Sequence, residues 1–199
     1  MPAAAPPADA AAYLDRGHQA YDAGQIEAAI ADYNRALQLK PDYADAYFWR
    51  GAAYARNGDY DPAIQDYNQA IHWKPDYSHA YNNRGIAYEN KGNYQQAIAD
   101  YSRAIELEPG WSWPYTNRGN VYANLHDYTH ALTDFTQAIK IDPQYAAAYV
   151  GLGDVYDSQG QLDQALANYT RAIALQPTLW QAYVNKSGAD YEMGNYPNA

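Results

Sequence analysis

The side chains whose spacing is most suggestive of chemistry are His126, Asp127 and His130. Two histidines flanking a carboxylate suit a zinc site when both imidazoles lie on one helix face. His126, however, falls at a turn between two predicted helices, where equivalent positions carry glycine. We therefore do not expect the imidazoles to converge, and we predict no metal site and no cofactor. The other histidines are scattered along the chain: His18, His72 and His79.

Other catalytic arrangements are also lacking in the sequence. The chain has no cysteine, which excludes a thiol nucleophile, a disulfide framework and a thiolate metal site. Glu106 and Glu108 form a carboxylate pair, but they fall near a helix end and are expected to be solvated. There is no glycine-rich phosphate loop, catalytic triad or nucleophile elbow. The sequence therefore predicts a protein that is not an enzyme.

The chain is organised instead by a period of 34 residues. Glycine, proline, two alanines and an aromatic residue each recur at this interval. The glycines are Gly17, Gly51, Gly85, Gly119 and Gly153, and the prolines are Pro41, Pro75, Pro109, Pro143 and Pro177. The aromatic residues are Tyr33, Tyr67, Tyr101, Phe135 and Tyr169. One structural unit is therefore repeated along the chain.

Each period is predicted to form two helices. In residues 45–57, Tyr47 and Gly51 lie four residues apart on one face of a helix. Gly58 supplies a left-handed stop, and Asp59 is a suitable N-cap for the next helix. A glycine inside a helix costs about 1 kcal/mol relative to alanine. We attribute its recurrence to close approach of the first helix to a small alanine of the second, with tyrosines filling the space between adjacent hairpins.

These motifs resemble the tetratricopeptide repeat, and the resemblance covers residues 10–199. The similarity is to the type with Asn-Arg-Gly at the glycine, as at 83–85 and 117–119. It implies an all-α right-handed superhelical solenoid of antiparallel helix pairs. The expected repeats are 10–43, 44–77, 78–111, 112–145 and 146–179, with a partial sixth at 180–199. Residues 1–9, rich in Ala and Pro, are expected to be a disordered tail.

An arginine precedes the glycine in four repeats, and an aspartate follows 16 residues later. The pairs are Arg16 with Asp32, Arg50 with Asp66, Arg84 with Asp100, and Arg118 with Asp134. In the fifth repeat both residues change together, to Leu152 and Asn168. This joint loss predicts an ion pair between the two helices of one hairpin, which fixes their register.

The resemblance also implies that the first helices of successive repeats line a concave peptide-binding groove. The residues assigned to that groove are Asp45, Phe48, Trp49, Arg56, His79, Asn82, Asn83, Glu89, Asn90, Trp113, Asn117, Asn120, Asn124 and Asp154. Asparagine side chains can pair with a peptide backbone, because an amide both donates and accepts hydrogen bonds. The series resembles the asparagine ladder of some grooves in this family, but Trp49 and Gly151 interrupt it. The aromatic residues either anchor a ligand or pack within the stack.

The net charge of the chain restricts the classes of binding partner that we expect. The formal charge is −10, from 13 Lys and Arg against 23 Asp and Glu, and no basic stripe for nucleic acid is present. No apolar run is long enough to insert into a membrane. Arg56 is the one cation assigned to the groove, so a chaperone-type C-terminal carboxylate is not expected. A neutral or basic protein or peptide segment suits the groove better.

Both ends of the array carry apolar residues. Tyr183, Val184, Tyr191 and Met193 make the last helix more apolar than a solvated cap should be. Either the chain is an excerpt of a longer array, or this end packs against another copy to form a homo-oligomer, or the helix caps imperfectly. Met1-Pro-Ala-Ala-Ala-Pro-Pro-Ala is not an intact signal peptide. A cytoplasmic location is expected, and a periplasmic or secreted one stays open if a signal peptide has been removed.

The sequence thus predicts a non-catalytic interaction scaffold that binds an extended peptide or a partner helix. One alternative is a structural array that self-assembles through its apolar ends. The other is a regulatory module of a larger protein.

Overall fold

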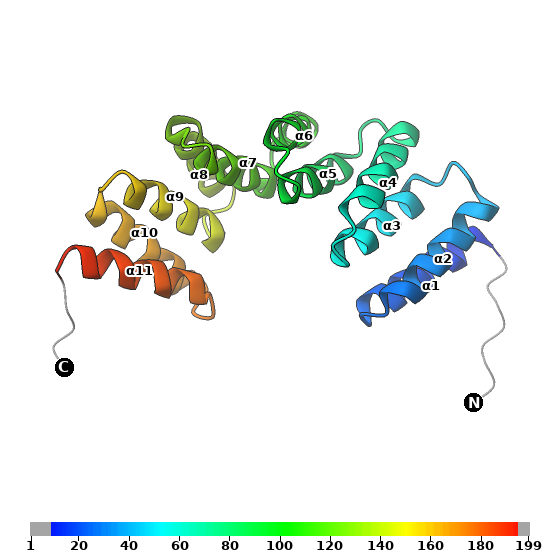
Figure 1. The fold of residues 1–199 in the computed structure, drawn as a ribbon, viewed down its shortest axis with the longest axis horizontal. Coiled ribbons are helices and arrows are strands. Elements are labelled where there is room, and N and C mark those ends of the chain that lie inside the picture. The colour runs from blue at the N-terminus through cyan, green and yellow to red at the C-terminus, as the bar shows by residue number, and fades with distance from the viewer. Residues whose placement is uncertain (1–8, 195–199) are drawn as a thin grey trace. The chain divides into compact units, whose positions relative to one another are not determined.

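The computed structural model describes residues 9–194, which form eleven helices and no strand (Figure 1). The helices are α1 (Ala10–Asp22), α2 (Ile26–Leu39), α3 (Ala44–Arg56), α4 (Tyr60–Trp73), α5 (Ser78–Asn90), α6 (Tyr94–Leu107), α7 (Ser112–Asn124), α8 (Tyr128–Ile141), α9 (Ala146–Ser158), α10 (Leu162–Leu175) and α11 (Trp180–Glu192). The prediction of an all-α repeat of helix pairs is confirmed. The tail expected at residues 1–9 lies outside the described residues, except for Asp9.

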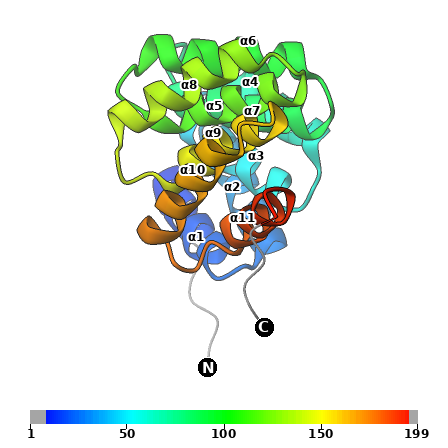
Figure 2. The ribbon, with the colours of Figure 1, turned by 90° about the vertical axis from the view of Figure 1, so that its left-hand side faces the viewer.

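The chain divides into two compact units, residues 1–107 and 108–199. The first unit contains the pairs α1/α2, α3/α4 and α5/α6, and the second contains α7/α8 and α9/α10. In the second unit α11 packs on α10 and also touches α9 (Figure 2). Each of the five complete repeats predicted from the sequence contains one of these helix pairs, and α11 lies in the predicted partial sixth repeat.

The helix ends follow from turn chemistry. Gly58 has a φ of 85°, which is the expected left-handed stop after α3. His126 occupies the equivalent turn after α7 with a φ of 60°. Asp59 precedes α4 as predicted, but its side chain makes no capping hydrogen bond. It accepts one from Asn57 instead, at 2.8 Å. By contrast, Asp9 caps α1 by accepting from the Ala12 amide at 2.8 Å.

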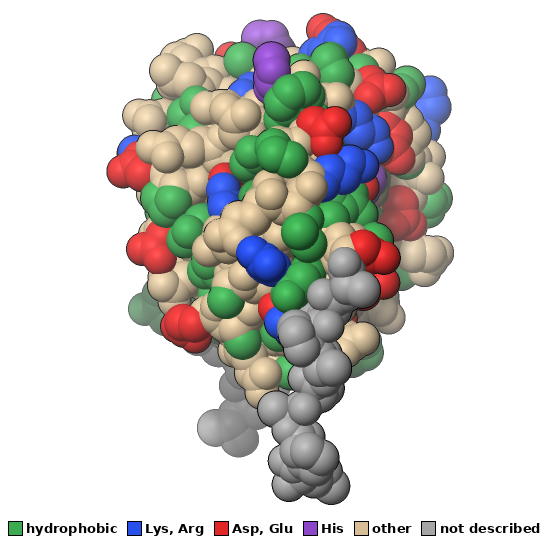
Figure 3. Space-filling model, turned by 90° about the vertical axis from the view of Figure 1, so that its right-hand side faces the viewer, with side chains coloured by type: hydrophobic (Ala, Val, Ile, Leu, Met, Phe, Trp, Pro, Cys, Tyr) green, Lys and Arg blue, Asp and Glu red, His purple; other side chains and the backbone are tan. Residues whose placement is uncertain are grey.

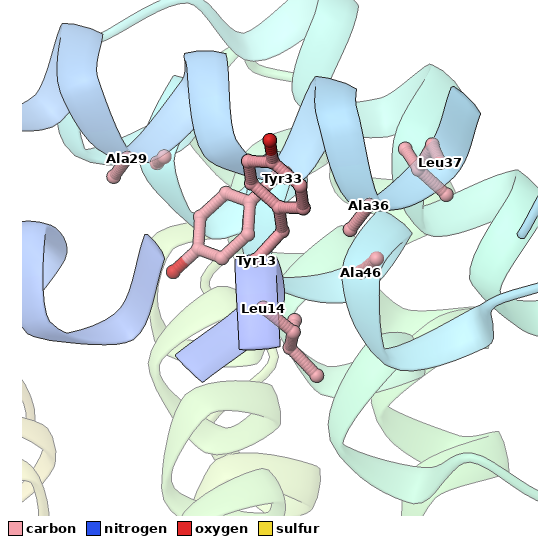
Figure 4. Packing of buried hydrophobic residues seen from close by; sticks show 8 residues of the cluster. Tyr13, Leu14, Ala29, Tyr33, Ala36, Leu37 and Ala46 are labelled. Atoms are coloured by element: carbon pink, nitrogen blue, oxygen red, sulfur yellow. The ribbon is translucent and has the colours of Figure 1, made fainter. Parts of the chain in front are cut away.

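The helical glycines lie against aromatic rings of the second helix. A Cβ atom added to Gly51 would lie 2.9 Å from Cε1 of Tyr67, and one added to Gly85 would lie 2.7 Å from Cε1 of Tyr101. The expected close approach to alanine occurs at Gly51, where the added Cβ would lie 3.2 Å from the carbonyl oxygen of Ala63, but the closest neighbour is the tyrosine ring. The glycine makes room for a tyrosine ring within the hairpin, and that ring is fully buried. Figure 4 shows Tyr33 in this position.

The four arginine–aspartate pairs are confirmed. Nε and Nη2 of Arg84 donate to the two carboxylate oxygens of Asp100 at 2.7 and 2.6 Å, linking α5 to α6. The structure adds a contact that the sequence analysis missed, because Nη1 of Arg84 donates to Asn68 of the preceding hairpin at 2.5 Å. Arg50 makes the same contact with Asn34. Each of these two guanidinium groups therefore connects three helices and joins neighbouring repeats.

The surface carries charges of both signs. On the face shown in Figure 3, Lys and Arg side chains are interspersed with Asp and Glu. Within residues 9–194, no helix combines the length and apolar character needed to cross a membrane.

Candidate functional site

In the first unit, the first helices α1, α3 and α5 enclose a hollow of about 240 Å³. Its lining is mostly apolar or aromatic, with one cation and one amide. The lining residues are Tyr21, Ala52, Ala55, Arg56, Tyr67, Asn83 and Ile86. The small side chains of Ala52 and Ala55 leave the space open, and Ile86 is 37% exposed. Two residues that the sequence analysis assigned to the groove, Arg56 and Asn83, therefore lie beside the same hollow.

Arg56 is held in place by α1. Its Nη1 donates to the carbonyl oxygen of Tyr21 at 2.9 Å, and its guanidinium carbon lies 4.8 Å from the centre of the Tyr21 ring. This carbonyl belongs to the last turn of α1, where the negative end of the helix dipole favours a cation, and it also accepts from the Gly24 amide at 3.0 Å. Part of the hydrogen-bonding capacity of Arg56 is therefore already used.

The groove aromatics of α3 have different roles. Phe48 is 7% exposed and lies in the core, where its ring centre is 4.9 Å from that of Tyr77. Its assignment as a ligand anchor was wrong, because its ring has almost no free surface. Trp49 is half-buried, and its ring centre lies 4.5 Å from that of His18 and 5.7 Å from that of Tyr21. Part of the Trp49 side chain therefore stays accessible.

The asparagines of the series also differ from one another in burial and in hydrogen bonding. Asn82 is 2% exposed, so it does not line an open groove as expected. Asn83 is half-buried and hydrogen-bonds the hydroxyl of Tyr67 from the preceding hairpin. Asn90 is exposed, and its side chain donates to the carbonyl of Ile86 at 2.8 Å. At least part of the series therefore stabilises the stack.

The second-helix tyrosines reach the first-helix face with their hydroxyl groups, a feature that the sequence analysis missed. Tyr101 donates to Glu89 at 2.6 Å, and Tyr169 donates to Asp154 at 2.8 Å. Asn185 also donates to Asp154, at 2.6 Å. The sequence carries only a weak signal for these contacts, because Glu89 lies 12 residues before its tyrosine and Asp154 lies 15 residues before its own.

Burial raises the pKa of Glu89, and the hydrogen bond from Tyr101 opposes this shift only in part. The ionised carboxylate is therefore less favourable in the folded state than in the unfolded chain. Folding stability from this group is present below its unfolded pKa and is lost as pH rises through the folded pKa. Burial raises the pKa of Asp154 in the same way.

We therefore expect Glu89→Gln to be more stable than the wild type at pH 7, because an amide oxygen still accepts the Tyr101 hydrogen bond without a buried charge. The advantage should shrink as pH falls and Glu89 becomes protonated. Urea unfolding at several pH values measures this difference, with Glu106→Gln at an exposed helix end as the control. A pH-independent difference would contradict the expectation.

In the second unit, Trp113 stands at the N-terminal end of α7 and is 54% exposed. Its ring lies nearly parallel to that of Tyr145 and stacks with that of Trp111, with centres 6.2 and 6.5 Å away. Further along α7, Asn120 and Asn124 are exposed, while Asn117 is half-buried. These four groove residues thus follow one helix, with an aromatic platform at its start.

Two assigned groove residues lie at the start of a first helix. The side chain of Asp45 accepts a hydrogen bond from the Tyr77 hydroxyl. His79 is exposed, and its Nδ1 lies 3.2 Å from the hydroxyl of Ser78. Neither residue lines the hollow.

The residues assigned to self-association are exposed on α11 and just after it. Tyr191 is 68% exposed, Val184 55%, Tyr183 48% and Met193 38%. Trp180, which the sequence analysis did not single out, is also 68% exposed. Ser187 stands where the other repeats carry their helical glycine. The last residues of the predicted partial sixth repeat, 195–199, lie outside the described residues.

His126 and His130 make separate contacts. Nδ1 of His126 lies 2.9 Å from the Tyr128 hydroxyl, whereas Nδ1 of His130 lies 2.7 Å from a carboxylate oxygen of Asp127. In residues 9–194, no group of three or more His, Asp or Glu side chains is placed to hold a metal ion.

Several solved structures have the same fold. YrrB, described as a TPR protein with an unusual peptide-binding site, is 24% identical, with a TM-score of 0.71 over 90% of this chain and 92% of its own. TTC0263 from Thermus thermophilus, described as a thermophilic TPR protein, is 26% identical, with a TM-score of 0.72 over 90% and 98%. The MamA protein is 23% identical, with a TM-score of 0.73 over 96% of each chain. No curated protein matches the chain in sequence.

Family models match almost the whole repetitive region. A model described as TPR repeat matches residues 17–58 and 56–92. Models described as tetratricopeptide repeat match residues 78–110 and 112–178. Together with the helix pairs and the glycine–tyrosine packing, these matches show that the chain belongs to the tetratricopeptide-repeat family.

Proposed function

We propose that this protein is a non-catalytic scaffold that holds an extended peptide segment of a partner against its first-helix faces. The family and the fold support a role in protein interaction. The observation that carries the peptide proposal is the hollow between α1, α3 and α5, where exposed Ile86 lies beside Arg56 and Asn83. An apolar lining with a few oriented polar groups is the usual character of a binding site.

The charges favour a neutral or basic segment. Arg56 is the one Lys or Arg side chain that lines the hollow, and it already donates to Tyr21. Across the faces of both units, the groove positions carry Asp45, Glu89 and Asp154. In the second unit the exposed ring of Trp113 adds a surface on which a cationic or apolar side chain stacks favourably.

Binding to an array of nonapeptides, followed by fluorescence anisotropy with the best peptide, tests this proposal. We expect Ile86→Lys to weaken binding about tenfold or more, because it places a charge in an apolar contact. The matched control is Leu39→Lys, which changes an exposed apolar residue at the end of α2, away from the hollow. Equal affinity of the two variants, or no binding to any peptide, would contradict the proposal.

A second candidate function is self-assembly through α11, favoured by the exposure of Trp180, Tyr183 and Val184. Light scattering after gel filtration, over a wide concentration range, distinguishes the two. If α11 mediates assembly, the mass rises with concentration, and Tyr183→Lys with Val184→Lys abolishes the rise while Ile86→Lys does not. A constant monomer mass would exclude this candidate.

A further inference from the structure

Two buried polar atoms in the first hairpin have no hydrogen-bond partner among the described residues. They are the hydroxyl of Tyr33, on α2, and Nε2 of His18, on α1. Tyr33 is fully buried, and burial lowers the pKa of His18, so its imidazole is neutral at pH 7. Leaving a buried polar group unpaired costs about 1–3 kcal/mol. Such a cost in a native structure calls for an explanation.

Other hairpins avoid this cost with a first-helix side chain, which stands at one of three positions relative to the tyrosine. The hydroxyl of Tyr67 is bonded by Asn83, that of Tyr101 by Glu89, and that of Tyr169 by Asp154. In the fourth hairpin, Phe135 has no hydroxyl, and the position equivalent to Asn83 is Gly151. The partner therefore disappears together with the hydroxyl. All of these partners lie on first helices, so the tyrosine hydroxyls point to the first-helix face.

The first hairpin breaks this rule. Trp49 stands at the position equivalent to Asn83, and Tyr21 at that of Glu89. The ring centre of His18 lies 5.8 Å from that of Tyr33 and 4.5 Å from that of Trp49. Aromatic rings thus stand at the positions from which a carboxylate or an amide bonds the tyrosine hydroxyl in other hairpins. Trp49 is half-buried and occupies the place of the missing amide.

We propose that His18 and Tyr33 form the polar floor of a subsite that receives the carboxamide side chain of an Asn or Gln residue in a bound peptide. This inference rests on the proposed function. The indole of Trp49 turns aside to admit the amide, which then makes the contact that Asn83 makes with Tyr67 in the next hairpin. A carboxamide fits because it offers a donor and an acceptor to the two unpaired atoms without bringing a charge.

Charged side chains fit this subsite poorly. The acidic residues that act on His18 are Asp15, Asp22 and Asp45, and they would repel a carboxylate. An ammonium group would lose its hydration between the aromatic rings. An apolar side chain would fill the space but leave both polar atoms unpaired.

The test uses the best nonapeptide from the array, with each Asn or Gln replaced in turn by Glu or Met. We expect one position at which Met weakens binding about tenfold and Glu about 100-fold. Tyr33→Phe should weaken binding of the Gln or Asn peptide about tenfold and leave that of the Met peptide unchanged. It should fold, because Phe135 occupies the same position in the fourth hairpin. Tyr169→Phe, which removes a bonded tyrosine hydroxyl at the equivalent position of the second unit, is the matched control and should not alter the preference.

Trp49→Asn gives a second, independent readout. It supplies the missing amide from within the chain, so the preference for a carboxamide should disappear. The matched control is Trp49→Ala, which loses the same ring packing without adding an amide and should therefore have the lower urea midpoint. If peptides bind without such a preference, or if Tyr33→Phe and Tyr169→Phe behave alike, the subsite is wrong and the proposed function stands. If no peptide binds, the proposed function itself fails.

Discussion

Gly85→Val is expected to lower the free energy of unfolding by about 3 kcal/mol. The added Cβ would lie 2.7 Å from Cε1 of Tyr101, and two further methyl groups would press on the same ring. Tyr101 is fully buried and its hydroxyl is fixed by Glu89, so the ring cannot move aside without losing that hydrogen bond. The measurement is urea unfolding followed by circular dichroism.

Gly188→Ala is the control for this prediction. Gly188 also lies inside a helix, α11, but no atom is within 4 Å of an added Cβ. Here alanine should stabilise the protein by up to about 1 kcal/mol, since only the helix propensity changes. Similar effects at both glycines would mean that contact with the tyrosine ring does not explain the recurrence of glycine.

Removing one partner of the Arg84–Asp100 pair should also be strongly destabilising. The two side chains are only 18% and 8% exposed, so either substitution to alanine leaves a poorly solvated charge. We expect a loss of about 2–3 kcal/mol for each variant, with the greater loss for Arg84→Ala because it also gives up Asn68. The double variant should cost little more than either single one. A double-mutant cycle with urea unfolding measures this coupling.

The fifth repeat supplies a natural comparison, because it carries Leu152 and Asn168 at these positions. Arg84→Leu combined with Asp100→Asn should therefore be much closer to the wild type than either alanine variant. Arg16→Ala is a milder control, since 44% of the Arg16 side chain is exposed. Additive effects at Arg84 and Asp100 would show that the two charges act independently.

The sequence predicted the repeat, its helix pairs and the ion pairs, because these features recur in phase. The joint change at Leu152 and Asn168 even identified which charges touch. Packing inside the hairpin was harder to predict. The spacing predicted that Gly51 approaches Ala63, but it did not show that the Tyr67 ring lies closer still.

The candidate site was less predictable than the fold. Family positions selected Arg56 and Asn83, and the structure places both beside one hollow. They could not tell which side chains the stack itself uses, so Phe48 and Asn82 were assigned to a surface although they are buried. The hydroxyl of Tyr33 is unpaired because Trp49 stands where the next hairpin carries Asn83. Aligning the repeats shows this replacement, but it does not show that the hydroxyl is buried without a partner.

The arginine contacts make the two ends of the array unequal as places for adding further repeats. Arg50 and Arg84 each reach back to an asparagine of the preceding hairpin, at Asn34 and Asn68. Arg16 also has a guanidinium group that is paired with its aspartate. If a hairpin were added before α1 with asparagine at the position equivalent to Asn34, Arg16 could donate a hydrogen bond to that asparagine. On the C-terminal side, Thr170 on α10 and Lys186 on α11 stand at the positions of the asparagine and the arginine, so this pair of residues is absent there. Engineered lengthening of this solenoid should therefore succeed more readily from its N-terminal side.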